Sequence, residues 1–108
     1  MGAYTFTTFA EGKTAKEAFA DAVNDARYEH GNDGYTGTIA EKHNFKLIAF
    51  PDYIDITKAN PVDATHFALK YAETLIENND KRISDKWGPA GCLDLKNGKF
   101  LFFGWASS

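Results

Sequence analysis

The spacing of apolar residues along the chain predicts two amphipathic helices. Between residues 15 and 26, alanine, phenylalanine and valine recur every three or four positions, which is the spacing of one helix face. A second stripe of this kind runs from residue 62 to residue 76. Each stripe follows a helix-start signal: Thr14 with Glu17 as a capping box, and Asn60 followed by Pro61. Because the first stripe is mostly alanine, we expect that helix to pack closely against a sheet.

β-Branched and aromatic runs predict the strands of that sheet. These runs cover residues 3–10, 35–42, 45–50, 92–96 and 99–105, with weaker strand character at 53–56. Asn97-Gly98 lies between the last two runs and predicts a hairpin with a two-residue turn. The predicted order is β-α-β-β-α-β-β in a single domain, residues 1–108. We therefore expect an α+β fold with an antiparallel-rich sheet and two helices packed on one face.

The last hairpin is apolar on both faces. A two-residue turn directs Leu93, Leu95, Phe100 and Phe102 toward the helices. The opposite face then carries Leu101, Phe103 and Trp105 together with Cys92. Burying a large apolar side chain contributes about 1.5–3 kcal/mol, so this second face should be covered. Two alternatives stay open: a cover from within the chain, or a surface that binds an aromatic ligand or a second copy. In a homodimer the interface would be Leu101, Phe103 and Trp105.

Composition limits the classes of function. The chain has 44% hydrophobic and 25% charged residues, which is typical of globular proteins, and a formal net charge of −3. No basic patch is present, so we do not expect nucleic-acid binding. No apolar run is long enough to span a membrane. The single cysteine, Cys92, fits a reducing compartment and a buried apolar role, which favours a cytoplasmic protein.

The glycine-rich stretch at residues 31–38 is the strongest candidate for a ligand site. Its backbone amides could form an anion-binding nest, with Tyr35 stacking on a base. Phosphate loops, however, run strand, glycines, helix, whereas here a helix C-terminus faces the glycines. A helix cap followed by a turn is the alternative. The predicted ligand-binding residues are Gly34, Tyr35, Thr36, Thr38 and Lys42, joined by Arg82 and Trp87 if the two loops meet.

Candidates for catalysis are fewer. His30 with Glu41 is a possible acid–base pair if the glycine-rich stretch folds back. The three histidines show no metal-ligand spacing, and no serine stands in a nucleophile elbow. We therefore predict no metal and no cofactor. Whether the chain is an enzyme stays open, with a non-catalytic role favoured.

The segment from Gly34 to Lys42, GYTGTIAEK, with residues 14–19 and 28–31 before it, resembles a family of small accessory proteins of tailed bacteriophages. The resemblance covers about the first 45 residues and brings no catalytic residue or cofactor. It implies a protein of the host bacterial cytoplasm that binds a host protein or sequesters a nucleotide-derived immune signal. We therefore expect a dimeric binding protein that antagonises a host factor or defence pathway. The alternatives are a small phosphoester-acting enzyme that uses His30 and Glu41, or a protein inhibitor that acts through its apolar sheet face.

Overall fold

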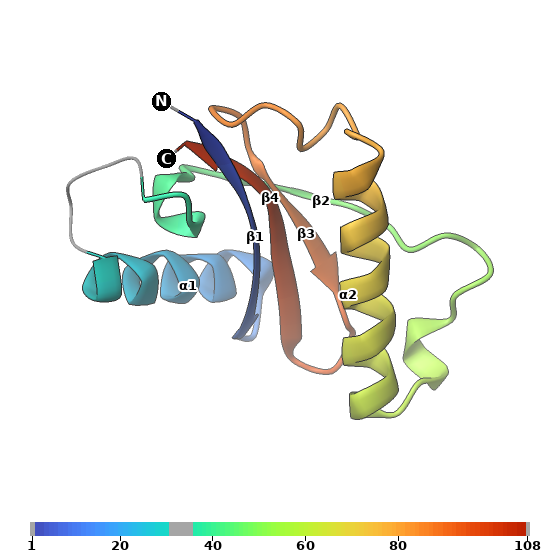
Figure 1. The fold of residues 1–108 in the computed structure, drawn as a ribbon. Helices are drawn as coiled ribbons and strands as arrows, with labels where there is room; N and C mark the ends of the chain where they lie inside the picture. The colour runs from blue at the N-terminus through green and yellow to red at the C-terminus, as the bar shows by residue number, and fades with distance from the viewer. Residues whose placement is uncertain (1, 31–35, 108) are drawn as a thin grey trace.

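The computed structural model describes residues 2–30 and 36–107 and has an α+β fold (Figure 1). Its helices are α1 (Ala15–His30) and α2 (Pro61–Glu77), with short 3-10 turns η1 (Ile39–Glu41) and η2 (Ile56–Lys58). Its strands are β1 (Ala3–Glu11), β2 (Phe45–Leu47), β3 (Ala90–Asp94) and β4 (Lys99–Ser107). The sheet order is β1-β4-β3-β2, with β4 antiparallel to β1 and β3, and β2 parallel to β3. A mostly antiparallel α+β sheet is thus confirmed.

Both helices begin where the sequence predicted. The Glu17 amide donates to Thr14 Oγ1 (3.2 Å), and the Glu17 carboxylate accepts from the amide of Lys13 (3.1 Å). At α2 the Asp63 amide donates to Asn60 Oδ1 (2.8 Å), with Pro61 in the first turn. These caps satisfy amides that have no partner inside the helix.

The helices lie on opposite faces of the sheet, so the prediction that both share one face is wrong. Ala18, Ala22 and Val23 of α1 pack with Phe100 and Phe102. On the other face α2 packs its small residues against apolar side chains of the last hairpin, Leu93, Leu95, Leu101 and Phe103. Figure 1 shows α1 and α2 on either side of the sheet. The second apolar face of β4 is therefore covered from within the chain.

The predicted hairpin register is wrong by one residue. Leu93 pairs with Leu101 and Cys92 with Phe102, and the Leu95 amide donates to the carbonyl of Lys99 (3.1 Å). The turn therefore contains three residues, Lys96 to Gly98. Its first and last residues, Lys96 and Gly98, have positive φ (61° and 86°). Because successive side chains of a strand point to opposite faces, this single extra residue exchanges the two faces of β4.

The predicted strand at residues 35–42 is also wrong over its described part. Residues 39–41 form η1, which begins when Thr38 Oγ1 accepts from the amide of Ala40 (3.2 Å). The sheet consequently has four strands, and its order along the chain is β-α-β-α-β-β. In the part of the chain that the structure describes, neither helix combines the length and the apolarity needed to cross a lipid bilayer.

Candidate functional site

Thr36 binds the protein's own Glu41 carboxylate, and Thr38 is hydrogen-bonded to Thr36. Glu41 Oε2 accepts from the Thr36 amide (3.1 Å) and from Thr36 Oγ1 (2.8 Å). The Thr36 and Thr38 hydroxyl oxygens lie 2.8 Å apart and share a hydrogen bond. The donors predicted to hold a phosphate are therefore satisfied internally, and the Glu41 charge would repel an anion here. Gly34 and Tyr35 lie outside the described residues.

Lys42 is buried, so its predicted contact with a ligand is wrong. Its side chain is 2% exposed, and its ammonium donates to three backbone carbonyls. These belong to Asp85 (3.3 Å), Lys86 (3.2 Å) and Gly88 (2.9 Å). Burial lowers the pKa of the Lys42 ammonium, and the nearby Asp85 carboxylate opposes that shift. Lys42 fastens the segment after η1 to the loop before β3.

The loop before β3 contacts the segment after η1 through Lys42, and Arg82 takes no part in this contact. The Gly37 amide donates to the Ser107 carbonyl (2.8 Å), and Lys86 Nζ reaches the Gly2 carbonyl (3.3 Å). Figure 1 shows the start of β1 and the end of β4 close to the loop before β3. Trp87 is 60% exposed there, with the Lys86 ammonium 5.3 Å from its ring centre. Nearby in β4, Trp105 Nε1 and Ser107 Oγ are buried without a hydrogen-bond partner among the described residues.

The predicted interface residues do not form a surface. Leu101 and Phe103 are completely buried beneath α2, and Trp105 is half-buried. An inhibitor or dimer that uses Leu101 and Phe103 is therefore excluded, because a partner cannot touch them. Cys92 is buried in β3 as predicted, and desolvation raises the pKa of its thiol to about 12.

The predicted acid–base pair is incomplete in the described structure. The Glu41 carboxylate accepts two hydrogen bonds from Thr36. The His30 side chain lies outside the described residues, as do residues 31–35. Within residues 2–29 and 36–107, no three histidine, cysteine or acidic side chains are grouped so as to hold a metal ion.

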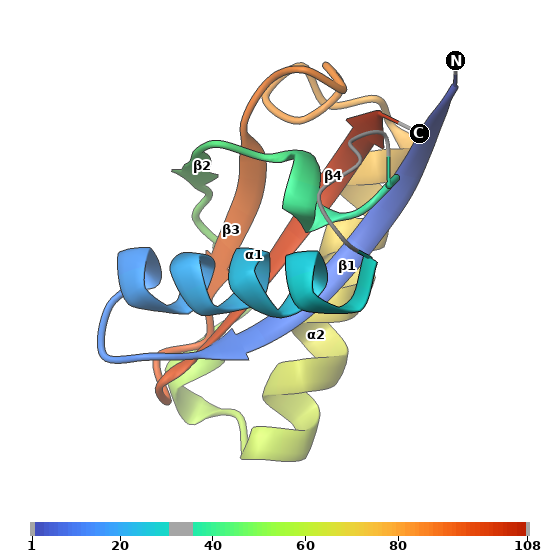
Figure 2. The same cartoon turned by 90° about the vertical axis from the view of Figure 1, so that its left-hand side faces the viewer.

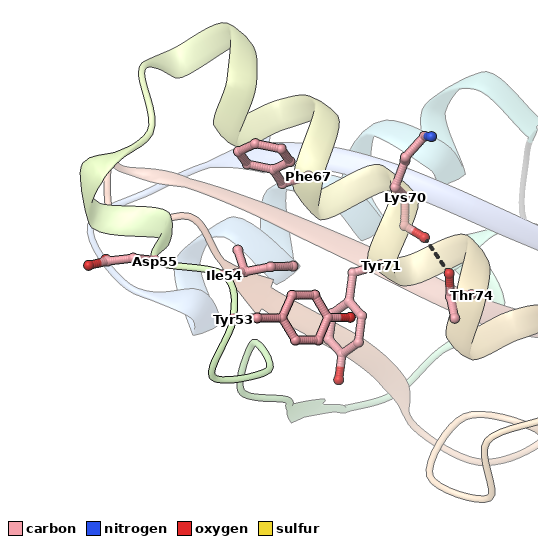
Figure 3. Close-up of a pocket in the computed structure, with 7 residues that line it drawn as sticks. All are labelled: Tyr53, Ile54, Asp55, Phe67, Lys70, Tyr71 and Thr74. Atoms are coloured by element: carbon pink, nitrogen blue, oxygen red, sulfur yellow. Dashed lines mark hydrogen bonds between the residues drawn. The ribbon is translucent and has the colours of Figure 1, made fainter.

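An aromatic groove lies between α2 and the segment before η2 (Figure 3). We use this name for the cavity of about 380 Å³ lined by Tyr53, Ile54, Asp55, Phe67, Lys70, Tyr71 and Thr74. Its volume is in the range of small-molecule sites. Figure 3 shows the Tyr53 and Tyr71 rings and the Ile54 side chain at its centre, with Phe67 beside them. Tyr53 is 84% exposed, so one wall of the groove stands open to solvent.

The walls of the groove differ in how firmly they are held. Tyr71 packs against the Phe50 ring, with centroids 5.9 Å apart, and it lies close enough to Arg82 to interact with it electrostatically. Within the described residues, Tyr53 makes no such contact with another ring. Tyr71 is therefore a fixed wall and Tyr53 an adjustable one.

Charged groups surround the groove without entering it. In Figure 3 the Asp55 carboxylate and the Lys70 ammonium point away from the two tyrosine rings. Asp55 caps η2, and a hydrogen bond from Thr57 lowers its pKa. Arg82, which interacts electrostatically with Tyr71, forms two side-chain hydrogen bonds with Asp80, both 2.9 Å. Lys46 also acts on the Asp80 carboxylate, so two cations face one anion at this end.

This groove was not among the predicted sites. Phe67 and Tyr71 are four residues apart and lie outside the apolar stripe that predicted α2. A pair of aromatic residues one helical turn apart, off the buried face, is a signal that could have indicated a contact surface. Tyr53 was instead assigned to a segment with strand character.

Comparisons with known proteins give no relative. No family model matches the chain, and neither does any curated protein or any solved structure.

Proposed function

We propose that this chain is a non-catalytic binding protein that captures a nucleotide-derived signal in the aromatic groove. In the phage context that the sequence resemblance implies, it would antagonise a host factor or defence pathway in the bacterial cytoplasm. The observation that carries the proposal is the pairing of an open aromatic cavity with a cationic end. Tyr53 and Tyr71 line the cavity. Tyr71 interacts electrostatically with Arg82, and Lys46 acts on Asp80, the ion-pair partner of Arg82.

A nucleotide has the chemistry that this groove accepts. Its base is planar and can lie between the rings of Tyr53 and Tyr71, and stacking on an aromatic side chain contributes about 1–3 kcal/mol per base. Its phosphate would face Arg82, whose planar guanidinium recognises phosphate oxygens through paired hydrogen bonds. Asp80 already occupies the Nε and one terminal nitrogen of that guanidinium. The phosphate would therefore contact the remaining donors of Arg82 and the Lys46 ammonium.

Thermal unfolding against a panel of cyclic and linear nucleotides tests the proposal. A ligand present at 100 times its Kd stabilises the folded state by about 2.7 kcal/mol, which raises the Tm of a domain this size by about 10 °C. Tyr53→Ala should lose at least ten-fold in affinity, because it removes one stacking wall. Tyr28→Ala is the matched control, since Tyr28 is 92% exposed on α1 and away from the groove. Equal affinity of the Tyr53→Ala variant and the wild type would refute the groove as the site.

A phosphoester-acting enzyme that uses His30 and Glu41 is the competing function. The two are separated by denaturing the loaded protein and identifying the released nucleotide by mass spectrometry. Intact nucleotide after prolonged incubation supports capture, whereas a hydrolysed product that disappears in His30→Ala supports the enzyme. A homodimer also stays a prediction, which sedimentation velocity tests directly. Since Leu101 and Phe103 are buried, its interface would have to be another surface.

A further inference from the structure

The outer edge of β1 presents unpaired backbone groups. The Gly12 amide donates to the Gly98 carbonyl of the neighbouring turn (3.1 Å). Backbone hydrogen bonding alternates along an antiparallel pair. The N–H and C=O groups of the even-numbered residues of β1 therefore point toward β4, and those of the odd-numbered residues point away from the sheet. The outward N–H and C=O groups belong to Ala3, Thr5, Thr7, Phe9 and Glu11. Among the backbone hydrogen bonds of the described residues outside the ladders, none is made by these five.

This edge lacks the devices that usually protect a sheet margin. Its nine residues contain no proline and no lysine. Its register with β4 is continuous from Ala3 to Glu11, so no bulge twists the edge away. In Figure 1, β1 runs between α1 on one side and α2 on the other, and Figure 2 shows the same strand at the margin of the sheet. An extended chain that pairs with β1 would therefore lie in a trough between the two helices.

Acidic side chains line both sides of that trough. On the α2 side, Thr5 and Thr7 share a groove of about 350 Å³ with Glu73 and Glu77. On the α1 side, three acidic residues and one lysine line a groove of about 380 Å³: Glu11, Asp21, Asp25 and Lys99. The Lys99 ammonium lies over the Phe9 ring, 5.5 Å from its centre.

These helix carboxylates are available for a partner. Asp21, Asp25, Glu73 and Glu77 are all exposed, and none of them belongs to an ion pair within the described residues. A strand added to β1 would send successive side chains alternately toward α1 and toward α2. Basic residues on both faces of such a strand would meet a carboxylate on each side.

We propose that the β1 edge is a docking site for an extended basic segment of a partner protein, which adds to the sheet as a fifth strand. Main-chain hydrogen bonds to the outward groups of β1 would fix the segment, and the acidic helices would select its charge. A second copy of this chain fits less well. Two copies paired antiparallel through β1 would place α1 beside α1 and α2 beside α2, so like charges would meet.

Amide hydrogen exchange on the wild-type protein tests the docking site directly. The probe is a nine-residue peptide of threonine and valine with a pair of lysines near each end, and glutamates replace the lysines in its control. We expect the lysine peptide to protect the amides of Thr5, Thr7 and Phe9. The amides of Phe6 and Thr8 are already bonded to β4, so their protection should change little. Peptide binding with protection elsewhere, or equal binding of the glutamate peptide, overturns the proposal.

The same experiment decides between a basic segment and a second copy. Protection of Thr5, Thr7 and Phe9 that rises with protein concentration alone, together with a dimer in sedimentation velocity, would assign the edge to a homodimer and overturn the proposal. Under the proposal these three amides exchange at the same rate at every protein concentration.

Two variants separate the backbone contribution from the charge contribution. Thr7→Pro removes an outward N–H and no bond to β4, so the protein should fold and lose at least ten-fold in affinity for the lysine peptide. Glu73→Lys should weaken binding about three- to ten-fold at low ionic strength, and the difference should disappear at high salt. Asp52→Lys is its control, because it changes the net charge equally in an exposed loop away from β1. Equal effects of the two lysine substitutions contradict a local charge contact.

Discussion

Replacing Lys42 with methionine should destabilise the protein without weakening ligand binding. Methionine has nearly the length of the lysine stem and fills the same buried space, but it cannot donate to the carbonyls of Asp85, Lys86 and Gly88. A buried carbonyl left without a donor costs about 1–3 kcal/mol. Asp85 is exposed and Lys86 and Gly88 are half-buried, so water can replace part of what is lost. We therefore expect a loss of about 1–3 kcal/mol in total, not for each bond.

Urea unfolding monitored by tryptophan fluorescence measures this loss. For a 108-residue chain, about 1–3 kcal/mol corresponds to a fall in Tm of roughly 4–12 °C. Lys16→Met is the control, since Lys16 is exposed on α1, and it should change stability by less than about 0.5 kcal/mol. An unchanged midpoint for Lys42→Met, combined with a loss of nucleotide affinity, would refute the structural role and restore Lys42 as a ligand contact.

Three further predictions concern the rest of the fold. The Arg82 guanidinium lowers the pKa of Asp80 to about 2. The stabilisation by this ion pair is therefore complete above pH 3.8 and is lost as the pH falls through 2. Because the pair is partly exposed, we expect the wild type to exceed Asp80→Asn in free energy of unfolding by about 1 kcal/mol or less, and acid unfolding measures the difference. The buried Cys92 thiol, with its pKa raised to about 12, should resist iodoacetamide at pH 8 and react fully in urea; rapid labelling of the folded protein would contradict its burial. Gly91→Ala should cost about 1–3 kcal/mol in urea unfolding, because its added methyl would lie 2.6 Å from the Phe103 ring, and a neutral result would mean that the ring moves freely.

Local signals in the sequence predicted the helices but not how they sit on the sheet. Thr14 and Asn60 predict the starts of α1 and α2 because an N-cap hydrogen bond joins residues only three positions apart. The faces of β4 depend instead on the length of one turn. Asn97-Gly98 favours two residues, yet Lys96 also adopts positive φ and extends the turn to three. The three-residue turn lets Leu101 and Phe103 pack against α2 while Phe102 packs against α1. This packing depends on contacts between distant segments, so a short-range sequence pattern does not predict it.

The candidate site was harder to predict than the fold. Lys42 looked like a ligand contact because a lysine after a polar loop is usually exposed, and only the distant carbonyls of residues 85–88 explain its burial. The aromatic groove joins Tyr53 to Tyr71 across η2 and the start of α2, so it exists only once the tertiary structure has formed. The spacing of Phe67 and Tyr71 on α2 was a local signal for this groove. The segment around Tyr53 contained no comparable pattern.

The pairing of β1 with β4 has a consequence for how the protein is made. Ala3 pairs with Ser107 and Glu11 with Lys99, so β1 finds its neighbour in the sheet only when residues 99–107 have left the ribosome. Until then β1 has no strand to pair with and the apolar face of α1 is not covered by β4. Nascent chains stalled before residue 99 should therefore be sensitive to proteases. Folding of this sheet therefore depends on a contact between segments about 90 residues apart, which should slow it relative to a fold built from local contacts.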